Sequence, residues 1–112
     1  MADAIETFDD YQRETTRTAG QFLSFDEGLT LAALGIGGEG GEVVDLVKKY
    51  RYHGRDLDLE KLKLELGDVL WYIAQAARVL GLSLSEVATA NIRKLEARYP
   101  NGFKREDAHE QG

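Results

Sequence analysis

Two pairs of acidic residues interrupt the apolar faces of two stretches with helical periodicity. The pairs are Glu39 with Glu42 and Glu65 with Asp68. Each pair has i, i+3 spacing, so both carboxylates project from the same side of an α-helix, about 5–6 Å apart. The apolar residues that share these two faces are Ile36, Val43 and Leu46 in the first stretch, and Val69, Tyr72 and Val79 in the second. Carboxylates that face a helical interior repel one another and lose hydration unless a positive charge lies between them. The pattern therefore predicts two helices that converge on a cation.

Four segments carry helical signals, and the only proline, Pro100, lies beyond all of them. Asp58 is the expected N-cap of the third segment and Gly81 its C′ residue. Ser83 and Glu86 form a capping box at the start of the fourth. The expected helices run from about Ala4 to Thr18, Leu29 to Tyr52, Leu59 to Leu80 and Ser83 to Arg98.

The connections between these helices are short, so neighbouring helices are expected to pack antiparallel. The second helix would be about 36 Å long, which exceeds what a domain of this size covers by itself. A symmetric oligomer would cover its remaining apolar side. We therefore expect an all-α, antiparallel four-helix-type bundle completed by homo-oligomerisation. Residues 1–103 form the predicted domain, and residues 104–112 form a polar tail that is expected to be mobile.

Composition excludes several functional classes. Acidic residues outnumber basic ones by 20 to 14, so bulk charge does not favour nucleic acid or an anionic membrane as a partner. The absence of cysteine excludes disulfides, thiol nucleophiles and cysteine-ligated metals. Neither a signal segment at the N-terminus nor an apolar run of 18 residues is present. These features lead us to expect a cytoplasmic protein.

The four carboxylates offer oxygen ligands only, which favours a hard divalent ion, Mg²⁺ first and Mn²⁺ second. A cluster of this charge has room for two ions, which would bridge a polyphosphate and lower the pKa of a bound water. The competing interpretation is structural, with the carboxylates neutralised in ion pairs by Lys48, Lys49, Lys61 or Arg78.

The glycines before and between the first acidic pair allow two interpretations. The segment from Gly35 to Gly40 matches the G-x-G-x-x-G pattern of dinucleotide-binding loops. That fold requires a strand on each side of the following helix, and nothing after Tyr52 has the pattern of a strand. The preferred interpretation is steric: four of the glycines allow close approach of a neighbouring helix or a bound nucleotide, which offsets their cost of about 0.5–1 kcal/mol each in a helix. These four are Gly37, Gly38, Gly40 and Gly41.

Three ordered motifs resemble a known family. The first is the run from Gly35 to Asp45, and the second the run from Glu65 to Tyr72. Together they resemble the E-x-x-E and E-x-x-D signature of the MazG-like all-α nucleoside triphosphate pyrophosphohydrolases, here with a 22-residue spacer. The run from Asn91 to Phe103 is similar to the closing motif of that family. The opening residues Tyr11, Gln12 and Arg17–Ala19 are similar to those of one branch of small, single-domain members. The resemblance covers roughly residues 8–103, and Gly40 stands where alanine is more usual.

The resemblance implies hydrolysis of a nucleoside triphosphate to the monophosphate and pyrophosphate. It implies Mg²⁺ held by Glu39, Glu42, Glu65 and Asp68 as the catalytic and metal-binding set, and helical homodimers that often pair into dimer-of-dimers tetramers. We therefore expect Mg²⁺-dependent hydrolysis of (deoxy)nucleoside triphosphates in house-cleaning of the nucleotide pool. The alternatives are a non-catalytic helical oligomer and a nucleotide-binding regulator.

Further side chains are candidates for contact with the substrate. Asn91, Lys94 and Arg98 stand at i, i+3 and i+7, so they share one face of the fourth helix. A lysine there supplies a point charge for a phosphate, and an asparagine bridges phosphate or sugar. Lys48 is a weaker phosphate candidate. Asp45 is a candidate support for the metal ligands. Trp71 and Tyr72 are more typical of a helical core than of a base-stacking platform.

Overall fold

The computed structural model describes residues 3–21 and 24–103, and no strand occurs in that part of the chain. It contains four helices: α1 (Phe8–Thr15), α2 (Phe25–Tyr52), α3 (Leu59–Val79) and α4 (Leu84–Arg98). The all-α prediction is confirmed, and the absence of a strand beside Gly35–Gly40 excludes the dinucleotide-binding alternative for the described residues. The predicted tail, residues 104–112, lies outside the described residues. None of the described helices combines the length and apolarity needed to cross a membrane.

Side-chain caps explain where these helices begin. Asp58 accepts a hydrogen bond from the Lys61 amide at the start of α3, as predicted, and Ser83 with Glu86 forms the predicted capping box of α4. The first two helices differ from expectation. Helix α1 starts only after its N-cap Thr7, and α2 starts four residues earlier than predicted, after its N-cap Ser24. An N-cap oxygen satisfies amides that have no partner inside the helix, so it sets the first residue more strongly than the apolar pattern does.

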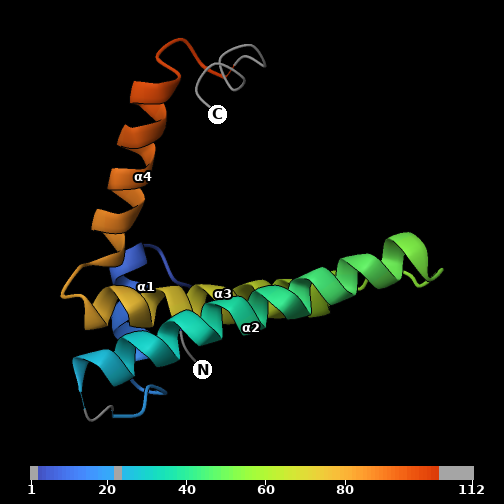
Figure 1. Cartoon of the computed structure of the whole chain (residues 1–112), viewed down its shortest axis with the longest axis horizontal. Helices are drawn as coiled ribbons and strands as arrows, with labels where there is room; N and C mark the ends of the chain where they lie inside the picture. Colours follow the sequence, from blue (N-terminus) through green and yellow to red (C-terminus); the bar gives the residue numbers. More distant parts are fainter. Residues whose placement is uncertain (1–2, 22–23, 104–112) are drawn as a thin grey trace.

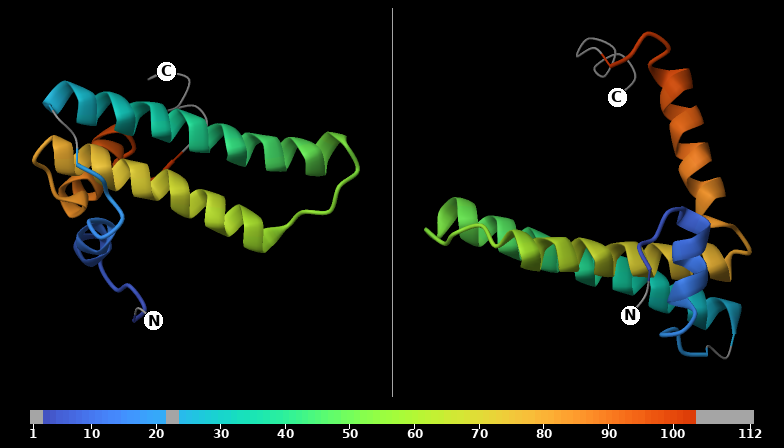
Figure 2. Two further views of the ribbon diagram at one scale, coloured as in Figure 1. Left: turned by 90° about the horizontal axis from the view of Figure 1, so that it is seen from below. Right: turned by 180° about the vertical axis from the view of Figure 1, so that it is seen from behind.

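The long helices α2 and α3 lie side by side and antiparallel, joined at one end by the loop that follows Tyr52 (Figures 1 and 2). Gly35 allows their close approach. A Cβ atom at this position would overlap the ring of Tyr72 on α3. The close contact between helices of one chain therefore falls at Gly35. The four glycines for which the sequence predicted it, Gly37, Gly38, Gly40 and Gly41, have nothing within 4 Å of an added Cβ atom in the single chain, and their role beside a bound nucleotide stays a prediction.

Helix α1 packs across α3 through polar contacts from its end. The Gln75 amide of α3 donates to the Thr15 hydroxyl at 2.8 Å, and both side chains are buried. The Trp71 indole N–H donates to the Thr18 hydroxyl at 2.9 Å. Trp71 and Tyr72 thus have the structural roles that their position in a helical stripe predicted: one anchors α1, and the other packs against α2.

Helix α4 does not fold back along the pair. It starts beside the end of α3 and projects away from α2 and α3 (Figure 1; Figure 2, right). The radius of gyration is 17.0 Å, compared with about 13 Å for a compact domain of this length. Within the described residues the buried apolar side chains are small apart from Leu84, namely Ala32, Ala74 and Ala77. The expected four-helix bundle is therefore incomplete in a single chain.

Candidate metal centre

Three of the four predicted carboxylates converge where α2 and α3 face each other. Glu39 comes from α2, and Glu65 and Asp68 come from successive turns of α3. One carboxylate oxygen from each lies within 4.8 Å of the others. Glu39 and Glu65 are half-buried, and Asp68 is exposed. The i, i+3 spacing on α3 and the close approach of the two helices together create a site with one open side.

The spacing of the three oxygens suits a divalent cation. Two ligands on opposite sides of Mg²⁺, each at about 2.0–2.1 Å, are about 4.2 Å apart, so the separation in the site needs only small side-chain movements. The donor set consists of carboxylates alone, which favours Mg²⁺ or Mn²⁺ over softer metals. The residues present therefore fit the ion that the sequence predicts.

The surroundings of Glu39 disfavour the charged form of its carboxyl group. Loss of hydration raises the pKa of the Glu39 carboxyl above its ordinary value, and the charges of Asp68 and Glu65 raise it further. A hydrogen bond to Glu65 and the charge of Glu42 add to the same effect. A cation bound among these carboxylates would relieve the repulsion.

The alternative of structural ion pairs does not hold for the described part of the chain. The ion pairs there are Arg13–Asp10, Arg17–Glu14, Lys49–Asp45 and Lys63–Glu60. None of them uses Glu39, Glu42, Glu65 or Asp68. Lys49, one of the lysines proposed to neutralise the cluster, binds Asp45 at 2.7 Å instead and lowers the pKa of that carboxyl.

Glu42 differs from the other three predicted ligands. It is exposed and lies outside the group of converging oxygens. It occupies the next turn of α2, and its charge is one of the causes of the raised pKa of Glu39. It is therefore near the cluster without being part of it, and its role as a metal ligand stays a prediction.

The predicted substrate-binding residues lie apart from the carboxylates within one chain. Asn91, Lys94 and Arg98 are exposed on α4, which projects away from the centre of the α2–α3 pair (Figure 1). Lys48 is exposed on α2, nine residues or about 14 Å along the helix from Glu39. None of these four side chains contributes to the cluster of three. Their roles in substrate binding stay predictions.

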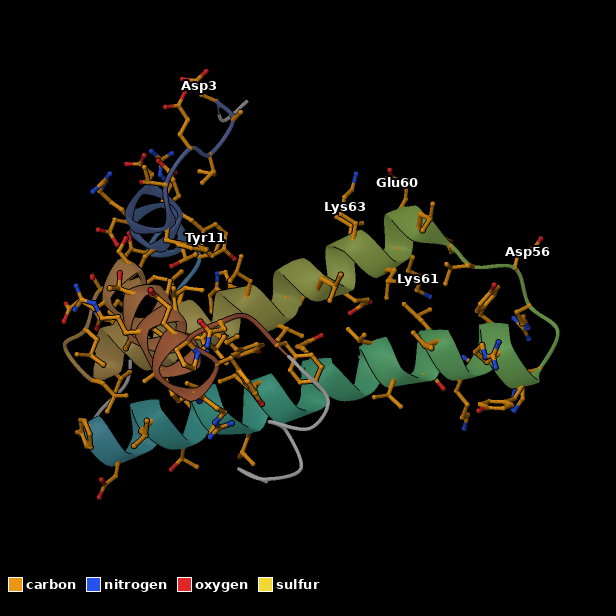
Figure 3. All side chains as sticks on the ribbon, turned by 90° about the horizontal axis from the view of Figure 1, so that it is seen from above. Asp3, Tyr11, Asp56, Glu60, Lys61 and Lys63 are labelled. Carbon is orange, nitrogen blue, oxygen red and sulfur yellow. The ribbon has the colours of Figure 1, made fainter. Side chains whose placement is uncertain are left out.

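Sequence reasoning assigned no role to Tyr11, a residue of α1 whose side chain extends toward α3 (Figure 3). Its hydroxyl donates to the Gly67 carbonyl over a long 3.5 Å. Burial raises the pKa of the Tyr11 hydroxyl, and the charge of Asp68 raises it further. Tyr11 therefore borders the carboxylate cluster from a third helix. The only signal in the sequence was its place in the opening motif, because a contact between residues 11 and 67 has no periodicity to reveal it.

Within the described residues, two helices bring three carboxylates together and no lysine or arginine forms an ion pair with them. This arrangement is that of an all-α protein with an acidic candidate metal centre. Comparisons with known proteins identify the family within this class. Residues 28–103 match the model of the MazG nucleotide pyrophosphohydrolase domain, and the chain belongs to this family. A relative, the gene 37 protein of Mycobacterium phage L5, is 41% identical over 83 residues, which cover 68% of this chain and 70% of the phage protein. The search of solved structures found no significant match.

Proposed function

We propose that the protein hydrolyses nucleoside triphosphates, ribo- or deoxyribonucleotides, to the nucleoside monophosphate and pyrophosphate in a reaction that depends on Mg²⁺. One observation carries the proposal: Glu39, Glu65 and Asp68 converge within 4.8 Å and have no ion-pair partner among the described residues. Membership of the MazG nucleotide pyrophosphohydrolase family supports the reaction class. A house-cleaning role in the nucleotide pool and a cytoplasmic location belong to the same proposal.

The three converging carboxylates would hold the cation. A divalent cation held by these residues would neutralise phosphate charge and lower the pKa of a bound water. Tyr11 and the α1–α3 contact keep the α3 carboxylates on a rigid support. A geometry held by packed helices is ready for the transition state without reorganisation.

Glu42 is our candidate for the general base. The three other carboxylates suffice to hold a cation, whereas Glu42 is exposed one turn along α2 and adjacent to them. A carboxylate in that position would accept the proton of the water that attacks the phosphoanhydride bond, while pyrophosphate leaves. In this role Glu42 would contribute to turnover more than to metal affinity.

Homo-oligomerisation is also part of the proposal, as a dimer or a dimer of dimers. It is supported by the large apolar side chains that stay exposed along the helices. On α2 these include Leu34 and Val44, which are 69% and 65% exposed, and on α4 Ile92 is 55% exposed. Apolar surface of this extent on a small chain marks an interface.

The test is to incubate purified protein with single nucleoside triphosphates, with and without Mg²⁺, and to measure pyrophosphate and monophosphate. Glu39→Gln and Asp68→Asn are each expected to lower kcat/KM by at least about 100-fold, because each removes an oxygen that holds the cation. Glu42→Gln is expected to lower kcat with little change in Mg²⁺ affinity. Glu60→Gln is the matched control, because Glu60 is an exposed acid on α3 that pairs with Lys63 and lies outside the cluster.

Three outcomes would contradict the proposal. Full activity in Asp68→Asn would show that the cluster is not the reacting site. Mg²⁺-dependent nucleotide binding without product would favour the nucleotide-binding regulator. Absence of both binding and a Mg²⁺-dependent thermal shift would favour the non-catalytic oligomer.

A further inference from the structure

A pocket of about 250 Å³ lies next to the candidate metal centre and has no role in the function proposed above. It is formed where the first turns of α2 and the last turns of α3 meet the loop that follows α1. Leu31 and Ala32 of α2 and Val79 of α3 supply much of its apolar wall. A pocket of this size is smaller than those that enclose a whole drug-sized ligand. It therefore suits one ring system of a ligand that extends beyond it.

The pocket continues the two helix faces that carry the carboxylates. Ala32 lies seven residues before Glu39, and Gln75 lies seven residues after Asp68. Seven residues are close to two helical turns, so each pair shares one face and is separated by about 10 Å along its helix. Because α2 and α3 are antiparallel, the two displacements point in the same direction (Figure 2). The pocket is thus placed about 10 Å from the carboxylates, which a ribose and its first phosphate can span.

Two aromatic rings supply flat surfaces in this pocket. Trp71 and Tyr72 both line it, with their ring centroids 5.0 Å apart and their planes at 85°. The Trp71 N–H donates to Thr18, and the Tyr72 ring packs on Gly35, so both rings are held in place before a ligand binds. Aromatic side chains stack on nucleobases of any kind. Rings that are already held lose little conformational freedom on binding, which favours affinity.

The buried polar groups of the pocket are hydrogen-bond donors. Gln75 is only 6% exposed, its oxygen accepts from Nε of Arg78 at 3.0 Å, and its nitrogen donates one hydrogen to Thr15 at 2.8 Å. What α3 offers a ligand is the second hydrogen of that nitrogen and a guanidinium group that has donors and no acceptor. A ring carbonyl accepts from such groups, whereas the amino group of adenine would set a donor against them.

We propose that this pocket binds the base of the nucleoside triphosphate and prefers a base with a ring carbonyl, such as hypoxanthine, guanine or uracil, to adenine. Trp71 and Tyr72 hold the ring, and Gln75 with Arg78 recognises the carbonyl. The inference rests on the proposed function, because the carboxylates then hold the phosphates of the same ligand. Base and phosphates are recognised by neighbouring turns of the same two helices.

Tryptophan fluorescence tests the pocket without any reaction. Trp71 is the only tryptophan of the chain, so its emission reports on this pocket alone. The probes are the free nucleosides inosine and adenosine, which carry no phosphate and therefore bind independently of a metal. Their purines have nearly the same size and differ in a carbonyl or an amino group at one position. Inosine should quench Trp71 saturably, and adenosine should bind about tenfold more weakly, because it loses a hydrogen bond to a charged donor.

Three variants connect the fluorescence change to the pocket. Val79→Phe fills the pocket and should abolish quenching by inosine. Leu80→Phe is the matched control, because it introduces the same side chain at the next residue, which is 48% exposed and lies outside the pocket. Arg78→Met removes the donors but keeps an apolar stem, so it should lower the affinity for inosine to that for adenosine. Circular dichroism checks that all three variants remain helical.

Hydrolysis supplies an independent comparison. The kcat/KM of inosine triphosphate should exceed that of adenosine triphosphate about tenfold, as for the nucleosides. Quenching by inosine in a protein that hydrolyses neither compound would support the pocket and contradict the proposed function. Hydrolysis of both without quenching by either nucleoside would overturn the pocket, as would equal binding of inosine to the wild type and Val79→Phe. Equal affinity of the wild type for inosine and adenosine would overturn the preference for a carbonyl.

Discussion

At the residue scale, one glycine decides how closely the two long helices approach. Gly35 faces the ring of Tyr72, whereas at Gly37, two positions along the same helix, an added Cβ atom would meet nothing within 4 Å. The two glycines thus differ in tertiary environment, although both occupy the interior of α2. This contrast allows the packing contribution to be separated from helix propensity.

We expect Gly35→Ala to lower the free energy of unfolding, because the added methyl group must displace the Tyr72 ring. Overpacking of this kind costs about 1–3 kcal/mol, which exceeds the gain of about 0.5–1 kcal/mol from helix propensity. Gly37→Ala, which meets open space, should gain the propensity contribution alone. Urea unfolding of the two variants measures both effects. Equal stabilisation of both would show that Tyr72 does not pack on Gly35.

The raised pKa of Glu39 predicts a pH dependence of stability in the metal-free protein. The pKa of this carboxyl is higher in the folded state than its ordinary value of 4.5, so the folded protein binds the proton more tightly than the unfolded chain does. Its contribution to stability is therefore fully present below that value and is lost as pH rises through the raised folded pKa. In a chelator, Glu39→Gln should be more stable than wild type at neutral pH, and the difference should vanish in acid. Thermal melts from pH 4 to 8 measure it.

Asp45 supplies a control of opposite sign. Its hydrogen bond with Lys49 lowers its pKa below the ordinary 3.8. Its contribution is present above the unfolded pKa and is lost as pH falls through the folded value. Asp45→Asn should therefore be less stable than wild type at neutral pH. A Glu39→Gln variant that behaves in the same way as Asp45→Asn would show that the cluster does not raise the pKa of Glu39.

At the element scale, α1 matters because it directs the chain after α3. This short helix contributes little apolar core, but its side chains hold the connection to α4 and the first turn of that helix. The Gln12 side chain makes two of these bonds: its amide nitrogen donates to the Leu82 carbonyl, and its amide oxygen accepts from the Leu84 amide. The capping box of α4 then sets the first residue of the helix, while Gln12 sets its direction.

We expect Gln12→Ala to loosen α4 without unfolding α2 and α3. The substitution leaves one carbonyl and one amide without their partner, which costs about 1–3 kcal/mol where these groups are shielded from water. Hydrogen exchange at the Leu84 amide should accelerate, while exchange in the middle of α3 should change little. Arg13→Ala is the control, because it removes only an exposed ion pair with Asp10, worth about 0–1 kcal/mol. Unchanged exchange at Leu84 would show that α1 does not hold α4.

At the scale of the whole molecule, the chain has too little core for its length. Its buried apolar residues are mostly alanines, and its long helices keep leucine and valine side chains exposed. The small core agrees with the extended shape of the chain, which has a radius of gyration of 17.0 Å. Leu34 and Val44 on α2 and Ile92 on α4 are each more than half exposed. The proposed oligomer would bury such side chains, which would make folding and assembly dependent on each other.

We expect the midpoint of thermal unfolding to rise with protein concentration, because an oligomer that dissociates on unfolding is stabilised by mass action. Ile92→Glu should abolish much of the dependence on protein concentration, because it places a charge on the apolar side of α4. Glu96→Gln on the same helix is the control, since it alters charge without touching the apolar side chains. Sedimentation at several concentrations checks the association directly. A wild-type midpoint that does not change over a hundredfold dilution would exclude a dissociating oligomer.

The sequence by itself predicted the local features of the fold and the residue types of the candidate centre. Capping residues and helical periodicity are local, so they predicted the starts of α3 and α4 and the all-α class. The i, i+3 spacing predicted that the two acidic pairs meet, and three of the four carboxylates, all except that of Glu42, converge. Residue type alone predicted a hard cation, because oxygen donors are a property of the side chains.

Only the tertiary structure decided which parts of the chain meet. Gly35 rather than its neighbours marks the closest helix approach, Tyr11 borders the cluster from α1, and α4 projects away from the pair. Each of these depends on contacts between residues far apart in sequence, such as Gln12 with Leu84, which leave no periodic trace. Short connections predicted antiparallel neighbours, but hydrogen bonds from another helix outweighed that tendency at α4. The helices follow from local interactions, whereas the direction of α4 follows from contacts between residues far apart in sequence.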